Sequence, residues 1–207
     1  MKLLIAGAGG HGKVVADAAA CRGDFSSVAF LDDRFPELAS VGDWPVVGRL
    51  ADLAVVSRRF DACLAAFGEP RLRLRILDEA GAAGYRLPVL VHPSATVARG
   101  VCLGDGTVVL AGAVVNIDAS VGRGCIINSG SVVEHDCVLG DGVHVCPGVS
   151  IAGEVRIGRC SWIGIGASII QRVVIGDCVT VGAGAVCVRD VSDEQTVMGV
   201  PAREYVT

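Results

Sequence analysis

The sequence contains no stretch of about 18 consecutive uncharged apolar residues, although 52% of its 207 residues are hydrophobic. A membrane-spanning helix needs such a stretch, so none is expected. The N-terminal apolar run KLLIA is shorter than the core of a secretory signal peptide and leads directly into a glycine-rich loop. These absences predict a soluble protein of the cytoplasm that makes no membrane contact.

An excess of positive charge is also absent, since the 22 Asp and Glu residues outnumber the 18 Lys and Arg residues, which gives a formal net charge of −4. Binding to nucleic acid or to an anionic membrane therefore has no bulk electrostatic basis. The nine cysteines include no CxxC pair, the usual spacing of a zinc site. We expect reduced thiols that serve as small apolar residues, and no bound metal.

A strict repeat of six residues occupies the second half of the chain. From Val91 to Cys187, sixteen of the seventeen residues at one position of the repeat are Val, Ile or Leu. An α-helix with 3.6 residues per turn would drift off this period, whereas a prism of short strands keeps it. Three repeats form one triangular coil of 18 residues with the aliphatic side chain inside, so seventeen repeats make between five and six coils.

The first part of the chain alternates predicted strands with predicted helices. Strands are expected at 2–6, 27–31, 61–67 and 86–91, and helices at 13–22 and 70–83. This alternation predicts a small parallel sheet of half the size of a full dinucleotide-binding fold. The sequence thus predicts a half-Rossmann α/β domain at 1–90 and a parallel β-helix at 91–207.

A GxGxxG motif at 7–12 follows the first predicted strand, and Asp32 lies 20 residues after its last glycine. Backbone amides of such a loop can hold phosphate at a helix N-terminus. The alternative is that the glycines only make a tight turn and bind no ligand. The pyrophosphate of a nucleotide-linked sugar is expected near Gly9, Gly10 and His11, and its base or ribose near Asp32 and Asp33.

The segment 134–136 of the predicted β-helix contains a histidine between two carboxylates. His135 follows the inward-pointing Val133 by two residues, so we expect it on an outer surface or corner of the prism. A neighbouring negative charge stabilises an imidazolium, which suits a general base. Gly153 lies one coil further along and leaves room for a thioester, and His144 lies half a coil further round. The alternative is an ordinary solvated histidine.

Several segments resemble the family of sialic acid O-acetyltransferases and nucleotide-amino-sugar N-acetyltransferases, which includes the bacillosamine and perosamine acetyltransferases. The similar segments are GAGGHG, FLDD at Phe30–Asp33, AAFG at Ala65–Gly68, HPSA, NSGSVVEHDC, HVCPGVSIAG at His144–Gly153 and GVPAR at Gly199–Arg203. The resemblance covers nearly the whole chain. It implies a left-handed β-helix and a homotrimer with active sites between neighbouring helices.

The resemblance also implies roles for individual residues. The residue matching His135 is the proton acceptor, and the acid matching Asp136 raises its basicity. Those matching His144, Gly153, Ile165 and Ala183 lie along the acetyl-CoA groove. Those matching Gly9, Gly10, His11, Asp32, Asp33 and Gly68 hold the nucleotide sugar.

Together these features predict an acetyl-CoA-dependent N-acetyltransferase of surface-polysaccharide biosynthesis. The expected acceptor is a nucleotide-linked 4-amino-4,6-dideoxy sugar, with direct transfer and His135 as general base. Acetyl-CoA is expected as a co-substrate, with no bound cofactor. The same site also permits O-acetylation of a sugar hydroxyl, as in sialic acid. The alternatives from other classes are a non-catalytic nucleotide-binding scaffold and a zinc-dependent carbonic anhydrase-like protein, which needs three histidine ligands.

Overall fold

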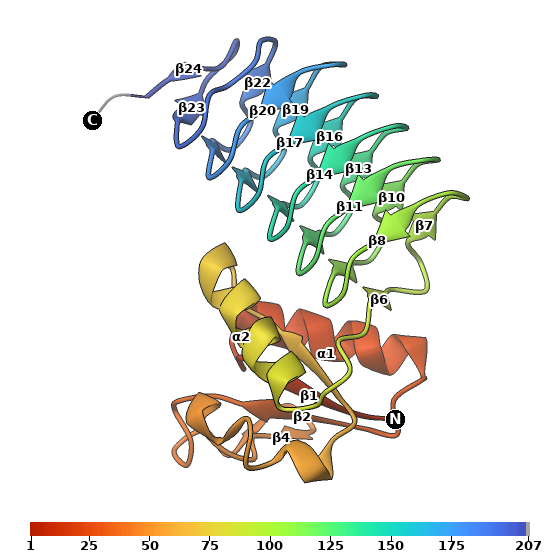
Figure 1. Cartoon of the computed structure of the whole chain (residues 1–207), viewed down its shortest axis with the longest axis vertical. Helices are drawn as coiled ribbons and strands as arrows, with labels where there is room; N and C mark the ends of the chain where they lie inside the picture. Colours follow the sequence, from red (N-terminus) through yellow and green to blue (C-terminus); the bar gives the residue numbers. More distant parts are fainter. Residues whose placement is uncertain (206–207) are drawn as a thin grey trace.

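The computed structural model describes residues 1–205 and has two parts, an α/β domain and a long β-helix stacked beside it (Figure 1). The α/β domain contains a three-stranded parallel sheet in the order β2-β1-β5. Its main elements are β1 (Lys2–Ala6), α1 (Gly10–Arg22), β2 (Ser27–Leu31), β5 (Ala62–Ala65) and α2 (Pro70–Ala82). The predicted small parallel α/β domain is confirmed.

The two helices cover opposite faces of this sheet because side chains of a strand alternate between its faces. Leu3 and Ile5 of β1 share a buried cluster with residues of α1. Ala6 packs with Ile76 and Leu77 of α2 on the other face. Both sides of the central strand are therefore buried, as its uninterrupted apolar sequence predicts.

Some local expectations were wrong. Helix α1 begins at Gly10 rather than Lys13, and residues 86–91 do not form one strand of the α/β sheet. Arg86 makes only an isolated bridge to Ala62, and the strand at Leu90–Val91 pairs within the β-helix. Four short elements between β2 and β5 were not predicted: β3 (Ser40–Val41), β4 (Trp44–Pro45) and the 3₁₀ turns η1 (Leu50–Asp52) and η2 (Ser57–Arg59). None of the helices described is long and apolar enough to cross a membrane.

The β-helix has three faces, each a stack of very short strands. The first face contains β6 (Leu90–Val91), β9 (Val108–Val109), β12 (Ile126–Ile127), β15 (His144–Val145), β18 (Trp162–Ile163), β21 (Thr180–Val181), β23 (Thr196–Met198) and β24 (Arg203–Glu204). The second contains β7 (Thr96–Val97), β10 (Val114–Val115), β13 (Val132–Val133), β16 (Ser150–Ile151), β19 (Ser168–Ile169) and β22 (Val186–Cys187). The third contains β8 (Cys102–Leu103), β11 (Ser120–Val121), β14 (Val138–Leu139), β17 (Arg156–Ile157) and β20 (Val174–Ile175).

Apart from the antiparallel pair β23 and β24 at the C-terminal end, neighbouring strands of a face are parallel and about one coil apart, so Val133 pairs with both Val115 and Ile151. These residues of the six-residue repeat are buried in one continuous core, and so are the small residues four positions after each of them, such as Cys137. The predicted β-helix and its inward column are confirmed. Val97 near the open end of the prism is only partly buried because no coil covers it there.

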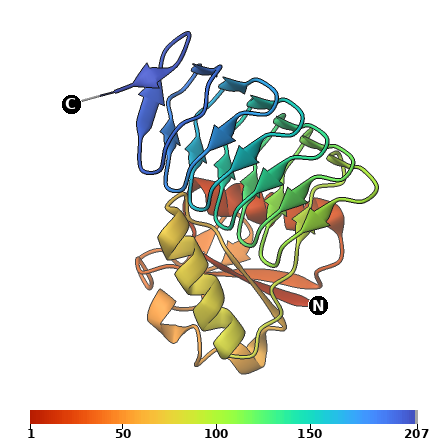
Figure 2. The same cartoon turned by 45° about the horizontal axis from the view of Figure 1, so that its top comes forward.

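The α/β domain packs on the first face and on the corner that leads into it (Figure 2). Val108 and Ile126 of that face share a buried cluster with Val15 of α1. Leu77 of α2 fills the space beside Gly124, where an added Cβ would lie 2.8 Å from its Cδ1. The glycine corner thus gives α2 close access to the β-helix backbone.

Candidate active site and nucleotide-binding loop

His135 lies at the corner after β13, between the second and third faces, and its side chain is 50% exposed. Its Nδ1 lies 2.8 Å from Oδ2 of Asp136. A carboxylate only accepts, so Nδ1 carries the hydrogen and Nε2 has a free lone pair. The hydrogen bond to Asp136, and then the negative charges of Asp136, Glu134 and Glu154, raise the pKa of His135 above its ordinary value of 6.5. This is the arrangement of a general base.

The backbone of the corner fixes this pair. Asp136 has a left-handed backbone with a φ of 59°, as has Asp118 one coil earlier with 60°. Aspartate tolerates this conformation better than most residues. The preceding carboxylate is held from the other side, because Nδ2 of Asn116 donates to Oε2 of Glu134 at 2.9 Å.

Gly153 lies directly beside the imidazole, as the stacking of coils predicts. A Cβ on Gly153 would lie 2.6 Å from both Cε1 and Nε2 of His135. The φ of Gly153 is not in the left-handed region, so glycine is needed here for space and not for backbone conformation. The absence of a side chain at Gly153 leaves Nε2 of His135 accessible from the next coil.

His144 lies elsewhere in the chain, as the first residue of β15 on the first face. Its ring centroid is 6.4 Å from that of His11 and 6.4 Å from that of Trp162. Nδ2 of Asn128 lies 3.2 Å from its Nε2. Burial, and then the charge of Arg73, lower the pKa of His144 to about 3, so the ring is neutral at physiological pH. A single chain therefore does not bring His144 to His135.

His11 belongs to the first turn of α1 and faces the β-helix. Burial, and then Arg73, lower its pKa to about 4. Among the described residues, Nε2 of His11 and Nδ1 of His144 are buried nitrogens without a hydrogen-bond partner. Two neutral histidines with unused nitrogens therefore meet between the domains.

The glycine loop of the α/β domain has the geometry expected of a phosphate-binding turn. A Cβ on Gly12 would overlap the carbonyl oxygen of Gly7, so the helix can approach the strand only with glycine there. Gly9 caps α1 with no side-chain hydrogen bond, and Gly9 and Gly10 are exposed. Amides at an uncapped helix N-terminus are available to an anion.

Asp32 lies beside this loop, where Oδ2 accepts from the amide of Ala8 at 2.9 Å. Its Oδ1 accepts from Nε of Arg34 at 2.7 Å, and this contact is the main reason that the pKa of Asp32 falls to about 2. Asp33 is directed differently, since its Oδ1 accepts from the amide of Leu50 at 3.0 Å. Gly68, in the loop between β5 and α2, is exposed. Arg34 was not predicted.

Arg73 of α2 was also missed by sequence reasoning. It is 1% exposed and donates at 2.6 Å to the carbonyl oxygens of Phe67, Gly124 and Gly142. Desolvation lowers its pKa to about 10. One guanidinium thus joins the loop before α2 to two successive coils of the β-helix. An arginine on an amphipathic helix is ordinarily solvated, and no local pattern distinguishes this one.

Ile165 and Ala183 occupy corresponding positions in successive coils, at the corner between the first and second faces. Both are exposed, and the amide of Gly184 donates to the carbonyl of Ile165 at 2.8 Å. Their corner is not the corner that carries His135. Within residues 1–205 no group of three or more His, Cys, Asp or Glu side chains is placed to hold a metal ion.

The fold and these residues define a class of protein in which a small α/β domain with a phosphate-binding turn joins a hexapeptide β-helix with an exposed histidine-carboxylate pair. Residues 2–80 match the family described as PglD N-terminal domain, and residues 118–153 match the bacterial transferase hexapeptide family. A curated relative, the UDP-N-acetylbacillosamine N-acetyltransferase of Bacillus subtilis (strain 168), is 36% identical over 111 residues. The match covers 53% of this chain and only 51% of that relative, about half its length.

Similar solved structures cover nearly all of the chain. The acetyltransferase domain of PglB from Neisseria gonorrhoeae FA1090 is 44% identical, with a TM-score of 0.95 and 99% of each chain covered, and has also been solved in complex with acetyl coenzyme A. A histidine-to-alanine mutant of the GDP-perosamine N-acetyltransferase from Caulobacter crescentus, in complex with CoA and GDP-perosamine, is 37% identical, with a TM-score of 0.96 and coverage of 100% of this chain and 98% of that chain. The chain belongs to the PglD-like nucleotide-sugar N-acetyltransferase family with hexapeptide repeats.

Proposed function

We propose that the protein transfers the acetyl group of acetyl-CoA to the amine of a nucleotide-linked 4-amino sugar. The observation that carries this proposal is the pairing of His135 with Asp136 beside the open position of Gly153. The relatives whose complexes contain acetyl coenzyme A, or CoA with GDP-perosamine, support the same pair of substrates.

In the proposed reaction the sugar amine attacks the thioester carbonyl directly. A new C–N bond forms, the C–S bond breaks, and the CoA sulfur leaves. Nε2 of His135 accepts the proton that the amine loses, while Asp136 stabilises the imidazolium through Nδ1. General-base assistance of this kind contributes about 10²–10⁴ in rate. A thioester is already activated, so no acyl-enzyme is needed.

The nucleotide of the acceptor is proposed to lie on the α/β domain. Open amides at Gly9, Gly10 and His11 suit a pyrophosphate, and Asp32 with the adjoining Asp33 lies next to them. Gly68 is exposed in the loop after β5, next to this site, although its carbonyl already accepts from Nη1 of Arg73 at 3.2 Å. Asp33 already holds the amide of Leu50, so any ligand contact has to share its carboxylate.

The acetyl-CoA groove is proposed to form between two chains of a homotrimer. The residues proposed for it are His144, Gly153, Ile165 and Ala183. In one chain these side chains lie on the first face and at two different corners, so one prism cannot gather them around one ligand. Packing a neighbouring prism against the first chain would complete the groove.

A substrate screen with a histidine variant tests the function. Purified protein is mixed with acetyl-CoA and UDP-, GDP- or dTDP-linked 4-amino sugars, and free thiol is followed. His135→Ala is expected to lower kcat by about 10²–10⁴ with an unchanged circular dichroism spectrum. The matched control is His92→Gln. Within residues 1–205 the side chain of His92 bonds only with Ser94 of its own turn, so this variant should keep near-normal kcat. Turnover with sialic acid hydroxyls but with no amino sugar would replace the proposal by O-acetylation.

A further inference from the structure

At one corner of the β-helix, the residue type at the left-handed backbone position changes from coil to coil. This residue is glycine in the coils against α2, at Gly106, Gly124 and Gly142. In the next two coils the same position is Cys160, with a φ of 58°, and Cys178, with a φ of 55°. Cysteine rarely adopts this conformation, and glycine would be the ordinary choice at both positions.

These two cysteines are stacked neighbours. They are 18 residues apart, and the amide of Cys178 donates to the carbonyl of Arg159 in the coil below at 2.8 Å. Paired parallel strands are about 4.8 Å apart, within the Cα separation of about 4.4–6.8 Å that a disulfide requires. No other two cysteines are one coil apart in the sequence. The sulfur of Cys160 is close to Gly142, so a rotation about its χ1 has to bring it to Cys178.

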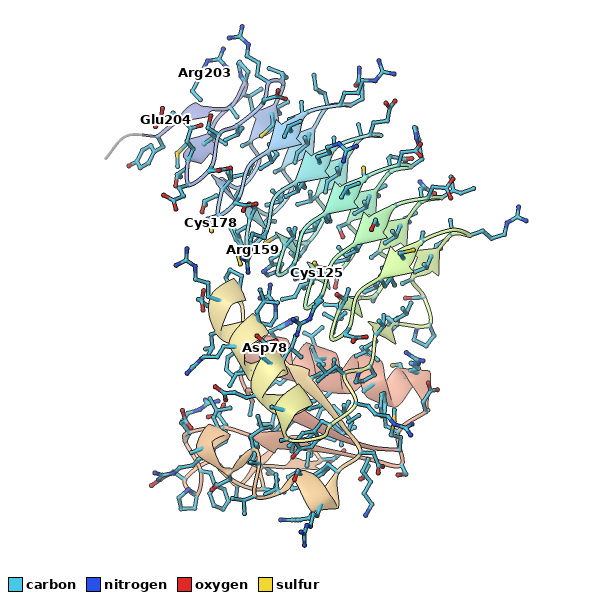
Figure 3. All side chains as sticks on the ribbon, viewed as in Figure 1. Asp78, Cys125, Arg159, Cys178, Arg203 and Glu204 are labelled. Carbon is cyan, nitrogen blue, oxygen red and sulfur yellow. The ribbon has the colours of Figure 1, made fainter. Side chains whose placement is uncertain are left out.

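The two thiols differ in environment. Cys178 is half-buried, and Nη2 of Arg71 donates to its Sγ at 3.5 Å, whereas Cys160 is buried. Both line a surface cavity of about 490 Å³ together with Arg71 and Arg159. Figure 3 shows Asp78 on α2 below the corner that carries Arg159 and Cys178. The other carboxylates that line this cavity are Asp177, Asp193 and Glu194. The guanidinium of Arg71 is a hydrogen-bond donor beside the sulfur of Cys178, and the cavity gives an oxidant access to it.

We propose that Cys160 and Cys178 are an oxidation site, in which hydrogen peroxide converts a stacked thiol pair into a disulfide between two coils. The thiolate of Cys178 attacks one peroxide oxygen, so an S–O bond forms, the O–O bond breaks and hydroxide leaves. Cys160, after losing its proton, attacks the sulfenic sulfur; the S–S bond forms, and the oxygen leaves as water. Two thiols lose two electrons in total, and one peroxide becomes two waters.

Peptide mapping of the full-length protein tests the site. The reduced protein is treated with hydrogen peroxide, its remaining thiols are alkylated, and trypsin is applied without reductant. Cleavage after arginine places the two cysteines in separate peptides, 160–172 and 173–189. The expected product is these peptides joined through Cys160 and Cys178, with Cys187 alkylated, and dithiothreitol should separate them. Recovery of both cysteines as alkylated or singly oxidised thiols, with no joined peptide, would overturn the proposal.

Two variants test the assigned roles. Cys160→Ser should leave a sulfenic acid on Cys178 that dimedone traps, and trapping on Cys21 or Cys102 alone would contradict this order of events. Arg71→Gln should slow the formation of the joined peptide by about tenfold. Its matched control is Arg75→Gln, because Arg75 is an exposed arginine of the same helix, 3.9 Å from Glu79. Equal rates for the two arginine variants would remove Arg71 from the proposal. None of these measurements depends on acetyl transfer.

Discussion

At the scale of the residue, the properties of His135 come from two neighbours in different coils. Asp136 follows it directly and binds Nδ1, while Gly153 lies beside Nε2. Asp136 sets the tautomer and raises the basicity of the ring, and Gly153 keeps space open at Nε2, the proposed proton acceptor. Two substitutions separate these effects.

Gly153→Ala is expected to remove space and not charge. The new Cβ would lie 2.6 Å from Nε2, so the ring has to rotate away and its bond to Asp136 is lost. Misplacing a catalytic group by about 1 Å can cost about 10² in rate, and we expect a fall in kcat of about that size in steady-state assays. Gly81→Ala, where an added Cβ meets nothing closer than 3.7 Å, is the control and should keep its kcat. An unchanged kcat for Gly153→Ala would contradict the proposed position of the thioester.

Asp136→Asn is expected to change the pH profile. The hydrogen-bonded carboxylate raises the pKa of His135 above 6.5, and only the neutral imidazole accepts a proton. In the wild type kcat/KM should therefore fall as the pH drops through the pKa of His135, which lies above 6.5. The variant should keep its activity to lower pH, but with a lower plateau because the base is weaker. Asp118→Asn, in the same corner conformation one coil earlier, should leave the profile in place. If kcat/KM falls at the same pH on the acid side in both variants, Asp136 does not set the pKa of His135.

At the scale of the element, α2 fixes the position of the α/β domain on the β-helix. Its buried Arg73 donates to carbonyls of Phe67, Gly124 and Gly142. Lysine has no planar fork of donors to reproduce these bonds. We expect Arg73→Lys to lower the free energy of unfolding by about 2–4 kcal/mol, since buried carbonyls lose partners. Urea unfolding measures this, with Arg75→Lys on the exposed side of the same helix as the control. Equal losses of stability in the two variants would mean that Arg73 does not join the domains.

The elements that the sequence predicts well are those with a local period. The aliphatic repeat predicts the inward column because every coil repeats the same contacts, and the glycines at 7–12 predict the tight turn between β1 and α1. The start at Gly10 was missed because glycine has a low helix propensity. The short hairpin and 3₁₀ turns have no period at all. Arg73 and the contact of His11 with His144 depend on how the α/β domain packs on the first face, which no local pattern contains.

At the scale of the whole molecule, the β-helix separates groups that the proposed reaction needs together. His135 lies at the corner between the second and third faces, and His144 lies on the first face beside His11. The α/β domain covers one end of that first face. In the proposed trimer, a nucleotide held by the α/β domain would lie near His144 of its own chain, and the general base His135 would come from a neighbouring chain.

Mixing two inactive variants tests whether the sites are shared. We expect His135→Ala to lose the general base and His144→Ala to lose a contact of the acetyl-CoA groove. In a trimer with each site between two chains, some mixed sites receive His135 from one variant and His144 from the other. Random assembly of equal amounts gives both intact side chains in about a quarter of the sites. Proteins unfolded together and refolded should then regain about a quarter of wild-type activity, and sedimentation should report three chains. The same proteins mixed without unfolding are the control and should stay inactive. If each site instead lies within one chain, the refolded mixture should also stay inactive.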